Sequence, residues 1–339
     1  MKILYAIQGT GNGHLSRAID VIPCLEKHGA VDILVSGIQG DLKLPYKVKY
    51  QFKGLSFIFG KSGGVDLWKT VRRSNPTKLI KNIQNLPVEE YDLVVNDFEP
   101  VSAWACYFKN KPCISLSHQS AVLNAAFPQP EHQDRMGRLI LEHYAPATAK
   151  YGFHFKSHGD GVYTPVIRKQ VRDMQVSDKG HYTVYLPAYD DKTLIKRLSV
   201  FPSVQWDVFS KHNHKKVVHK NITIRPINNE LFTASMASSS GVLCGAGFET
   251  PAEAMFLGKK LLVIPMKNQY EQHLNAALLK QMGVPVIKGL KPKYEDVIAH
   301  WILNGEPIAV DYPNRTQEIV NKIIFKHASD AYFTPVQTV

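Results

Sequence analysis

Two glycine-rich turns, each directly before an expected helix, carry the residues whose types and spacing point to chemistry. Residues 9–14 read GTGNGH, and residues 243–253 read LCGAGFETPAE. In the second turn, glycines before a helix expose backbone N–H groups, and the helix dipole adds partial positive charge at the same place. This combination binds phosphate, so we expect a phosphate compound at residues 245–250.

Two histidines and two carboxylates are candidates for proton transfer. His14 directly follows the first turn, and a helix N-terminus favours the neutral imidazole, which can accept a proton. Asp97 ends an apolar stretch at residues 91–96, where a carboxylate can orient an imidazole and stabilise its cation. Glu99 competes with Asp97 for that role, and His118, which also follows an expected strand, competes with His14 as the base. Helix capping and core packing are the alternative roles for these side chains.

Polar side chains after the second turn suit a sugar nucleotide. Glu253 can accept two hydrogen bonds from the diol of a ribose, and adjacent Glu271 and Gln272 offer donors and acceptors for vicinal sugar hydroxyls. A purely structural alternative is open for Thr250 and Glu253, because they have the spacing of a helix capping box. Ile227, in a loop after an expected strand, can hold a flat base through its backbone groups.

Alternating strand and helix patterns must position these residues. Residues 3–7 form a short apolar run typical of a buried parallel strand, and a helix and a second strand follow the glycines. The patterns weaken over residues 127–161, and residues 164–178 read as a linker. A second alternating region begins at residue 181. The sequence therefore predicts two doubly wound α/β domains, which bind ligands in the crevice outside the carboxyl ends of their strands.

Length and composition exclude several classes of protein. The chain has 339 residues, which suits two domains better than one core. Its net charge is +12, but no dense run of Lys and Arg predicts a nucleic-acid partner. The four cysteines have neither metal-ligand nor disulfide-framework spacing, which fits a reduced, cytoplasmic setting. No apolar stretch approaches the about 20 residues that a membrane span needs.

Two cofactor classes are also disfavoured. The first turn has the spacing Gly-x-Gly-x-Gly, and Ser36-Gly37 stands where an NAD-binding domain carries an acidic residue. No Asp-x-Asp pair stands at a strand end, and Asp190 and Asp191 are adjacent, so their side chains would point apart in a strand. We therefore expect no cofactor and no metal ion.

Together, the motifs resemble those of nucleotide-sugar glycosyltransferases with the GT-B fold. The patterns are Gly-x-Gly-x-Gly-His at residues 9–14, Gly-x-Gly-x-x-Thr-x-x-Glu at 245–253, and Pro-x(5)-Glu-Gln-x-x-Asn-Ala at 265–276. They are similar to those of the N-acetylglucosaminyltransferase of the peptidoglycan lipid precursor and of UDP-glycosyltransferases. The resemblance implies two Rossmann-like domains facing across a cleft, residues 1–165 on the acceptor side and 166–313 on the nucleotide-sugar side. A helix within residues 314–339 would return to the first domain.

The same resemblance implies roles for individual residues. His14 would be the catalytic base with Asp97 as its partner, and His118 would lie on the acceptor side. The donor would be bound by residues of the turns and of the later polar pair: Gly11, Gly13, Ile227 at uracil, Gly247, Phe248 and Thr250 at the diphosphate, Glu253 at the ribose, and Glu271 and Gln272 at the sugar. Residues 187–191, PAYDD, depart from the pattern, because the peptidoglycan enzyme has a glycine-rich loop there.

We therefore expect an inverting, metal-independent glycosyltransferase that moves a sugar from a UDP-sugar to an acceptor hydroxyl. Two alternatives are open: a UDP-sugar hydrolase or epimerase on the same fold, and a non-catalytic module that binds nucleotide sugars. The acceptor is not identified. Basic and aromatic residues in segments 52–66 and 127–144 suit a lipid-linked acceptor and contact with the inner face of the membrane, although a solvated basic face explains them equally well.

Overall fold

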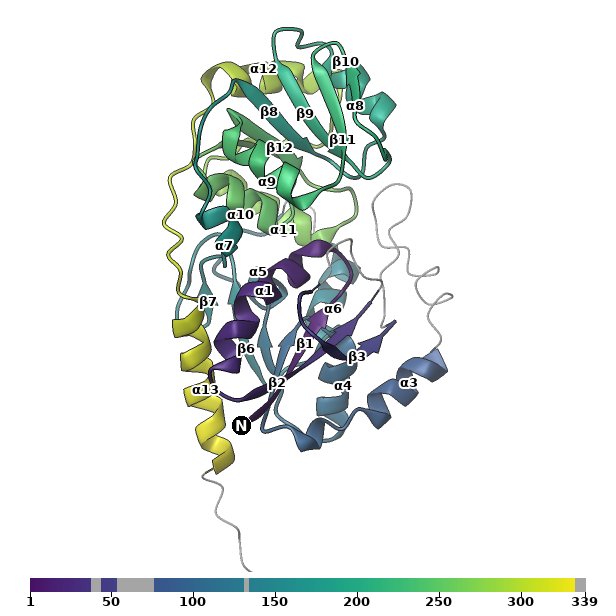
Figure 1. Ribbon diagram of the computed structural model, residues 1–339, viewed down its shortest axis with the longest axis vertical. Coiled ribbons are helices and arrows are strands. Elements are labelled where there is room, and N and C mark those ends of the chain that lie inside the picture. The colour runs from purple at the N-terminus through teal and green to yellow at the C-terminus, as the bar shows by residue number, and fades with distance from the viewer. Residues whose placement is uncertain (38–43, 54–75, 131–133, 333–339) are drawn as a thin grey trace, which may run out of the picture.

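The structure is a computed structural model that describes residues 1–37, 44–53, 76–130 and 134–332, with side chains to residue 328. It contains two α/β domains, one above the other in Figure 1, and each is built on its own twisted sheet. Every pairing between strands of these sheets is parallel except that of β10 with β11. The predicted fold class, two doubly wound α/β domains, is confirmed.

The first sheet has the strand order β3-β2-β1-β4-β5-β6-β7. Its strands are β1 (Lys2–Gln8), β2 (Ala30–Ser36), β3 (Val48–Phe52), β4 (Leu93–Asp97), β5 (Ile114–Leu116), β6 (Ala149–Phe153) and β7 (Val162–Tyr163). The helices of this part are α1 (Asn12–Glu26), α3 (Pro76–Asn85), η1 (Val88–Glu90), α4 (Pro100–Phe108), α5 (His118–Val122) and α6 (Arg135–His143). The continuous apolar run of β1 is buried, as expected for a central parallel strand covered on both faces.

The second sheet has the strand order β10-β11-β9-β8-β12-β13. Its strands are β8 (His181–Tyr185), β9 (Gln205–Ser210), β10 (Val217–His219), β11 (Ile222–Pro226), β12 (Gly241–Gly245) and β13 (Lys260–Ile264). Its helices are α8 (Asp191–Leu198), α9 (Asn229–Ser238), α10 (Glu249–Phe256), α11 (Tyr270–Gln281), η2 (Pro292–Tyr294) and α12 (Glu295–Asn304). The short α7 (Lys169–Arg172) lies in the segment between the two sheets.

The strand order of each sheet reverses beside its first strand, β1 in the first sheet and β8 in the second. In each sheet the strands that follow the first one are added on one side of it, and the later strands are added on its other side. As a result β1 lies beside β4 in the first sheet, and β8 lies beside β12 in the second. Ile7 pairs with Asp97 across β1 and β4, which brings the first glycine turn next to Asp97. Ligands of doubly wound sheets bind at such reversals of strand order.

The last helix, α13 (Thr316–Tyr332), lies against the first domain although it follows the second (Figure 1). It contacts α1, and its Asn321 Oδ1 lies 2.8 Å from Nε2 of His28, two residues after the end of α1. Tyr151 Oη on β6 also lies 2.9 Å from His327 Nε2. The chain thus crosses between the domains twice, once before β8 and once before α13.

Several sequence-based expectations differ from the structure. The weakly patterned residues 127–161 contain α6 and β6, and the expected linker contains α7. The expected strand at residues 284–287 is reduced to a single bridge between Val263 and Val286. Much of the basic segment 52–66 lies outside the described residues. In the part of the chain that the structure describes, no helix has the length and apolarity needed to cross a bilayer.

Candidate functional site

His14 and Asp97 form a hydrogen-bonded pair at the carboxyl ends of β1 and β4. His14 is the third residue of α1, and its Nδ1 lies 2.8 Å from Oδ1 of Asp97. A carboxylate only accepts, so Nδ1 carries the proton and the lone pair is on Nε2. Nε2 makes no hydrogen bond to a described residue, and 13% of the His14 side chain is exposed. The pair has the arrangement of an oriented general base.

Arg17, one helical turn after His14, shares the carboxylate. Its Nη2 donates to both oxygens of Asp97, at 2.7 and 2.8 Å, and lies 3.1 Å from Nδ1 of His14. Burial by itself raises the pKa of Asp97, but the charges of Arg17 and His14 outweigh it and lower that pKa. Asp97 is therefore an anion at neutral pH although it is completely buried. Arg17 was not identified from the sequence.

The chain turns sharply directly after Asp97. Phe98 has φ 57°, a left-handed conformation that is rare for a bulky residue and is concentrated at functional sites. The turn sends Glu99 away from His14: its carboxylate caps α4 by accepting from the backbone N–H groups of Val101 and Ser102, both at 2.7 Å. Of the two acidic candidates, the structure thus pairs Asp97 with His14 and uses Glu99 as a helix cap.

The second glycine turn faces the first across the two domains. Arg17 Nη1 donates to Oε1 of Glu249 at 2.6 Å, and a Cβ added to Gly13 would lie 2.7 Å from Oε2 of the same carboxylate. Glu249 is the first residue of α10. The start of α10 is therefore joined to the His14–Asp97 pair through Arg17.

The structure does not form the capping box that was the structural alternative for Thr250 and Glu253. Helix α10 begins one residue before Thr250, and its N-cap residue, Phe248, makes no side-chain capping bond. The N–H groups of the first turn thus have no side-chain cap, and a Cβ added to Gly247 would meet no atom within 4 Å. Open backbone N–H groups beside open space suit an anionic ligand.

Glu253 is instead held by an arginine that lies between the two sheets. Arg168 donates to its two oxygens, Nε to Oε1 at 2.5 Å and Nη2 to Oε2 at 2.6 Å. Arg168 Nη1 also donates to Asn229 Oδ1 at 2.6 Å, so it ties α10 to α9. Burial raises the pKa of Glu253, and Arg168 opposes that shift. The predicted contact of Glu253 with a ribose must therefore compete with this ion pair.

His118 lies in the contact between the domains and is completely engaged. Its ring stacks on the ring of Phe248, with the ring centroids 4.0 Å apart and an angle of 6° between the ring planes. Nδ1 lies 2.8 Å from the carbonyl of Phe153, and Nε2 lies 2.9 Å from Oδ1 of Asn275 on α11. Burial lowers the pKa of His118, although the nearby charge of Glu271 opposes the shift. Neither ring nitrogen is available to a substrate in this arrangement.

The two residues predicted at the donor sugar have protein partners. Gln119 Nε2 donates to Oε2 of Glu271 at 3.0 Å across the domains. Gln272 Oε1 accepts from the backbone N–H of Met266 at 2.9 Å and so orders the loop after β13. The remaining predicted donor residues make no side-chain bond that defines a role: Gly11 is exposed, and Thr250 and Ile227 are half-buried.

A cavity of about 840 Å³ opens beside this site, between residues 128–130 of the first domain and the strand ends of the second. Its walls are mainly apolar, and it is bordered by the end of β12 at Gly245. Among the described residues that line it are several basic side chains and no Asp or Glu. The basic residues are Lys267, His273, Lys280, Lys288 and Lys291. Sequence reasoning missed this set because the lysines are spread over three segments without a motif.

In the described residues, no group of three or more His, Cys, Asp or Glu side chains could hold a metal ion.

The two facing parallel-sheet domains, with the polar site between their strand ends, define the GT-B class of proteins. Solved structures of that class are similar over nearly the whole chain. MurG of Acinetobacter baumannii has a TM-score of 0.57 and 15% identity, covering 95% of this chain and 98% of that one.

Two further structures show the same similarity. UGT89C1 of Arabidopsis thaliana complexed with UDP-L-rhamnose has a TM-score of 0.58 and 15% identity, covering 96% of this chain and 94% of that one. The glycotransferase of kitacinnamycin has a TM-score of 0.57 and 12% identity, covering 97% and 95%. A search of curated proteins found no match. The family model described as glycosyl transferase family 1 matches residues 1–304. This protein therefore belongs to glycosyl transferase family 1 and is a glycosyltransferase.

Proposed function

We propose that the protein transfers a sugar from a UDP-sugar to an acceptor hydroxyl with inversion at the anomeric carbon and without a metal ion. The observation that carries this proposal is the His14–Asp97 pair, linked through Arg17 to the uncapped start of α10. The similar Arabidopsis thaliana enzyme was solved with UDP and with UDP-L-rhamnose, which supports UDP as the carrier. These features support a mechanism with a base on one domain and an anion-binding helix start on the other.

His14 is the base in this mechanism. Its Nε2 lone pair takes the proton of the acceptor hydroxyl while that oxygen bonds to the anomeric carbon and the bond from this carbon to the UDP oxygen breaks. Asp97 holds the ring through Nδ1 and stabilises the imidazolium that forms. General-base assistance of this kind contributes roughly 10²–10⁴-fold in rate. His118 is unsuited to the task because both of its ring nitrogens face oxygen atoms of the protein.

The leaving UDP gains negative charge, and the second domain supplies positive charge for it. The first-turn N–H groups of α10 lack a side-chain cap, and Gly247 leaves space for a phosphate to come close. Lysines of the adjoining cavity add long-range attraction. Donors that are already oriented toward developing charge stabilise a transition state more than a ground state.

The other predicted donor contacts remain part of the proposal. Ile227 would hold uracil, Phe248 and Thr250 would lie at the diphosphate, and Glu271 with Gln272 would bind the sugar. Glu253 would reach the ribose by releasing one carboxylate oxygen from Arg168. A Glu253→Gln variant tests this step: it should melt at a lower temperature, because it breaks the buried ion pair with Arg168, and it should also bind UDP-sugar more weakly. A lower melting temperature with unchanged UDP-sugar binding would make Glu253 purely structural.

A lipid-linked acceptor at a membrane surface is the acceptor that the first domain suits best. On α6, Met136 and Leu139 are 53% and 50% exposed beside Arg135 and Arg138, which is the composition of an interfacial helix. Lys61, Lys69, Arg72 and Arg73, the other basic residues whose replacement would test membrane contact, lie outside the described residues. Co-sedimentation with anionic vesicles should be lost in the M136E/L139E variant. Equal recovery with the vesicles for both proteins would count against membrane contact.

Incubation with a panel of UDP-sugars tests the proposed reaction. Transfer to added lipid-linked or soluble acceptors, unchanged by EDTA, is the expected result, and the product should have the inverted anomeric configuration. Release of free sugar without an acceptor would identify a hydrolase, and isomerised donor would identify an epimerase. Binding without turnover for every donor and acceptor would leave a nucleotide-sugar binding module.

A further inference from the structure

A second cavity, of about 790 Å³, lies within the second domain and away from the carboxyl ends of its strands. Three parts of the chain form its walls: residues of β8, β9 and β11, residues along one side of α9, and residues 174–179 before β8. His181 and Gln205 are the first residues of their strands, so the cavity opens at the opposite end of the sheet from Gly247. None of the residues proposed for donor binding lines it.

The cavity exists because α9 presents small side chains to a polar part of the sheet. The α9 residues that line it are Leu231, Ala234, Ser235, Ala237 and Ser238, and only the first is large. Helix α9 contacts β8, the first strand of this sheet. Helix–sheet contacts are normally apolar and tightly packed. Phe232 of α9 makes such a contact with Tyr185 and Phe209 of the sheet, and the small side chains beside it leave an open cavity with room for a ligand.

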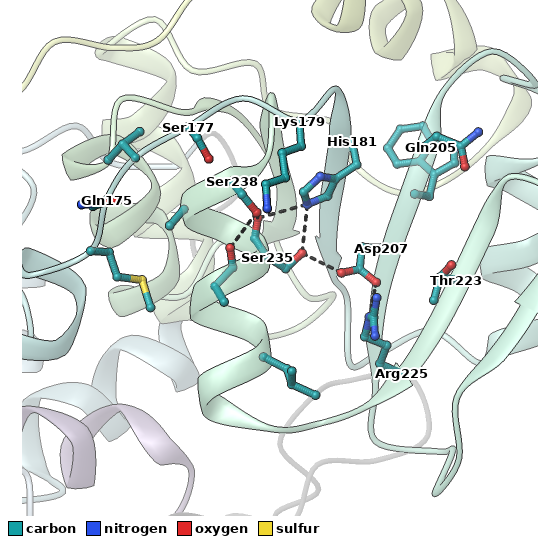
Figure 2. Close-up of a pocket in the computed structure, with 16 residues that line it drawn as sticks. Gln175, Ser177, Lys179, His181, Gln205, Asp207, Thr223, Arg225, Ser235 and Ser238 are labelled. Atoms are coloured by element: carbon teal, nitrogen blue, oxygen red, sulfur yellow. Dashed lines mark hydrogen bonds and ion pairs between the residues drawn. The ribbon is translucent and has the colours of Figure 1, made fainter.

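A hydrogen-bonded chain holds the floor of the cavity rigid, as Figure 2 shows. Ser235 Oγ donates to Oδ2 of Asp207 at 2.8 Å, and Arg225 Nε donates to Oδ1 of the same carboxylate at 2.6 Å. At the other end of this hydrogen-bonded series, His181 Nε2 lies 3.1 Å from the carbonyl oxygen of Ser235. The single carboxylate that lines the cavity is thus already neutralised by Arg225.

Several donors that line the cavity are not used by the protein. The two Nη atoms of Arg225 and the Nζ of Lys179 make no hydrogen bond to a described residue, and the same holds for the side chains of Gln205 and Thr223. With Asp207 paired to Arg225, Lys179 leaves an excess of one positive charge. Guanidinium and ammonium groups bind phosphate, and amide and hydroxyl groups bind sugar hydroxyls.

We propose that this cavity, at the face of β8, β9 and β11 under α9, is a binding site for a small phosphorylated sugar, separate from the cleft between the domains. Lys179, which carries the excess charge, binds the phosphate, and Arg225, with the uncommitted Gln205 and Thr223 side chains and the hydroxyls of α9, binds the sugar. Its volume falls within the range of about 300–1,000 Å³ that is usual for small-molecule sites. The site does not depend on the His14–Asp97 chemistry.

Thermal shift and calorimetric titration with glucose 1-phosphate and glucose 6-phosphate test this proposal on the full chain, with glucose and inorganic phosphate as comparison probes. At least one of the sugar phosphates should raise the melting temperature at millimolar concentration and bind more tightly than glucose or inorganic phosphate. Absence of binding by both sugar phosphates, or equal binding of glucose, would overturn the proposal.

Two variants locate the site. Lys179→Met removes an exposed charge that has no protein partner, and Ala234→Leu fills the cavity from an exposed position of α9. Each should weaken sugar-phosphate binding by about tenfold or more, because one charge-assisted contact or the space itself is lost. The matched control is Lys196→Met, because Lys196 is an exposed residue of α8 outside the cavity. This variant should bind the sugar phosphate like the wild type. Wild-type affinity in both test variants would place the ligand elsewhere.

Saturating UDP separates this site from the donor cleft. Sugar-phosphate binding should persist when UDP is present, and displacement by UDP would overturn the proposal by placing the probe in the cleft. If UDP itself does not bind, the proposed function fails, but the effects of Lys179→Met and Ala234→Leu still decide whether this cavity is a site.

Discussion

Arg17 donates three hydrogen bonds to Asp97 in the first domain and a fourth to Glu249 in the second, so one guanidinium joins the proposed base to the proposed donor helix. Arg17 is 3% exposed and Asp97 is fully buried, whereas 26% of the Glu249 side chain is accessible. The pair with Asp97 is therefore the structural one. The pair with Glu249 is open to exchange with a bound anion.

The His14–Asp97 pair should control the rate of transfer rather than stability of the fold. His14→Ala should lower kcat by about 10²–10⁴-fold, the usual contribution of a general base. Asp97→Asn should also lower kcat, because an amide cannot stabilise the imidazolium as a carboxylate does. Steady-state kinetics measure both effects. His212→Ala, on an exposed histidine of the second domain, is the control and should keep full activity. Full activity in His14→Ala would remove His14 as the base.

Loss of Arg17 should destabilise the protein more than loss of Glu249. Arg17→Met leaves the buried Asp97 with His14 alone, and an uncompensated buried charge costs about 3–5 kcal/mol of unfolding free energy. Glu249→Gln removes a partly accessible partner and should cost much less. A double-mutant cycle by denaturant unfolding should give a coupling of about 1 kcal/mol between Arg17 and Glu249.

The exposed pair Lys169–Asp173 provides the comparison for that cycle, since its side chains are 80% and 60% exposed and should show little coupling. Equal coupling in the two cycles would mean that the contact between Arg17 and Glu249 contributes nothing specific to the approach of the domains.

Two buried histidines should make the protein less stable in mild acid. Burial lowers the pKa of His118, and burial together with the charge of His118 lowers the pKa of His154. Above about pH 6.5 both residues are neutral in the folded and unfolded states and cost nothing. Below that pH the unfolded chain binds protons that the folded one excludes. Each histidine then removes about 1.4 kcal/mol of stability per pH unit until its folded pKa is reached.

Replacing each histidine by phenylalanine should separate its charge from its contacts. His154 lies among Phe127, Phe155 and Phe248, and its ring nitrogens have no hydrogen-bond partner in the described chain, so His154→Phe should preserve stability at pH 7. It should also flatten the decline between pH 6.5 and 5, which melting curves over that pH range measure. An unchanged decline would show that His154 does not cause it.

His118→Phe is the matched contrast. It loses the contacts with the Phe153 carbonyl and with Asn275, so it should lower stability by about 1–3 kcal/mol at pH 7. The same melting experiment measures it. A neutral result would mean that these two contacts do not stabilise the contact between the domains.

We expect the small size of Gly247 to be needed for ligand binding and the small size of Gly241 to be needed for stability of the fold. A Cβ on Gly247 meets no protein atom within 4 Å, so Gly247→Val should keep its melting temperature and lose UDP affinity by about tenfold or more. A Cβ on Gly241 lies 2.9 Å from the Lys260 carbonyl and from the Tyr182 ring, so Gly241→Val should unfold at lower temperature. Calorimetry with UDP and thermal melts measure both. Unchanged UDP affinity in Gly247→Val would move the diphosphate away from this turn.

Local sequence patterns were enough to predict much of the architecture. Apolar runs such as residues 3–7 identify buried strands because a parallel strand covered on both faces has no polar side to show. Glycines before α1 and α10 identify the two turns because such turns need small residues. The candidates His14 and Asp97 also follow from strand ends, since parallel strands place their carboxyl ends at one edge of the sheet.

Only the tertiary structure decided which polar groups are partners. Thr250 and Glu253 have the spacing of a capping box, yet Glu253 pairs with Arg168, which is 85 residues away. Glu99 competed with the predicted Asp97 until the left-handed turn at Phe98 directed Asp97 to His14 and Glu99 to α4. Helix starts and strand ends depend on neighbouring residues, so the sequence determines them locally. Ion pairs between distant segments depend on how whole domains pack, and packing is settled only when the complete chain has folded.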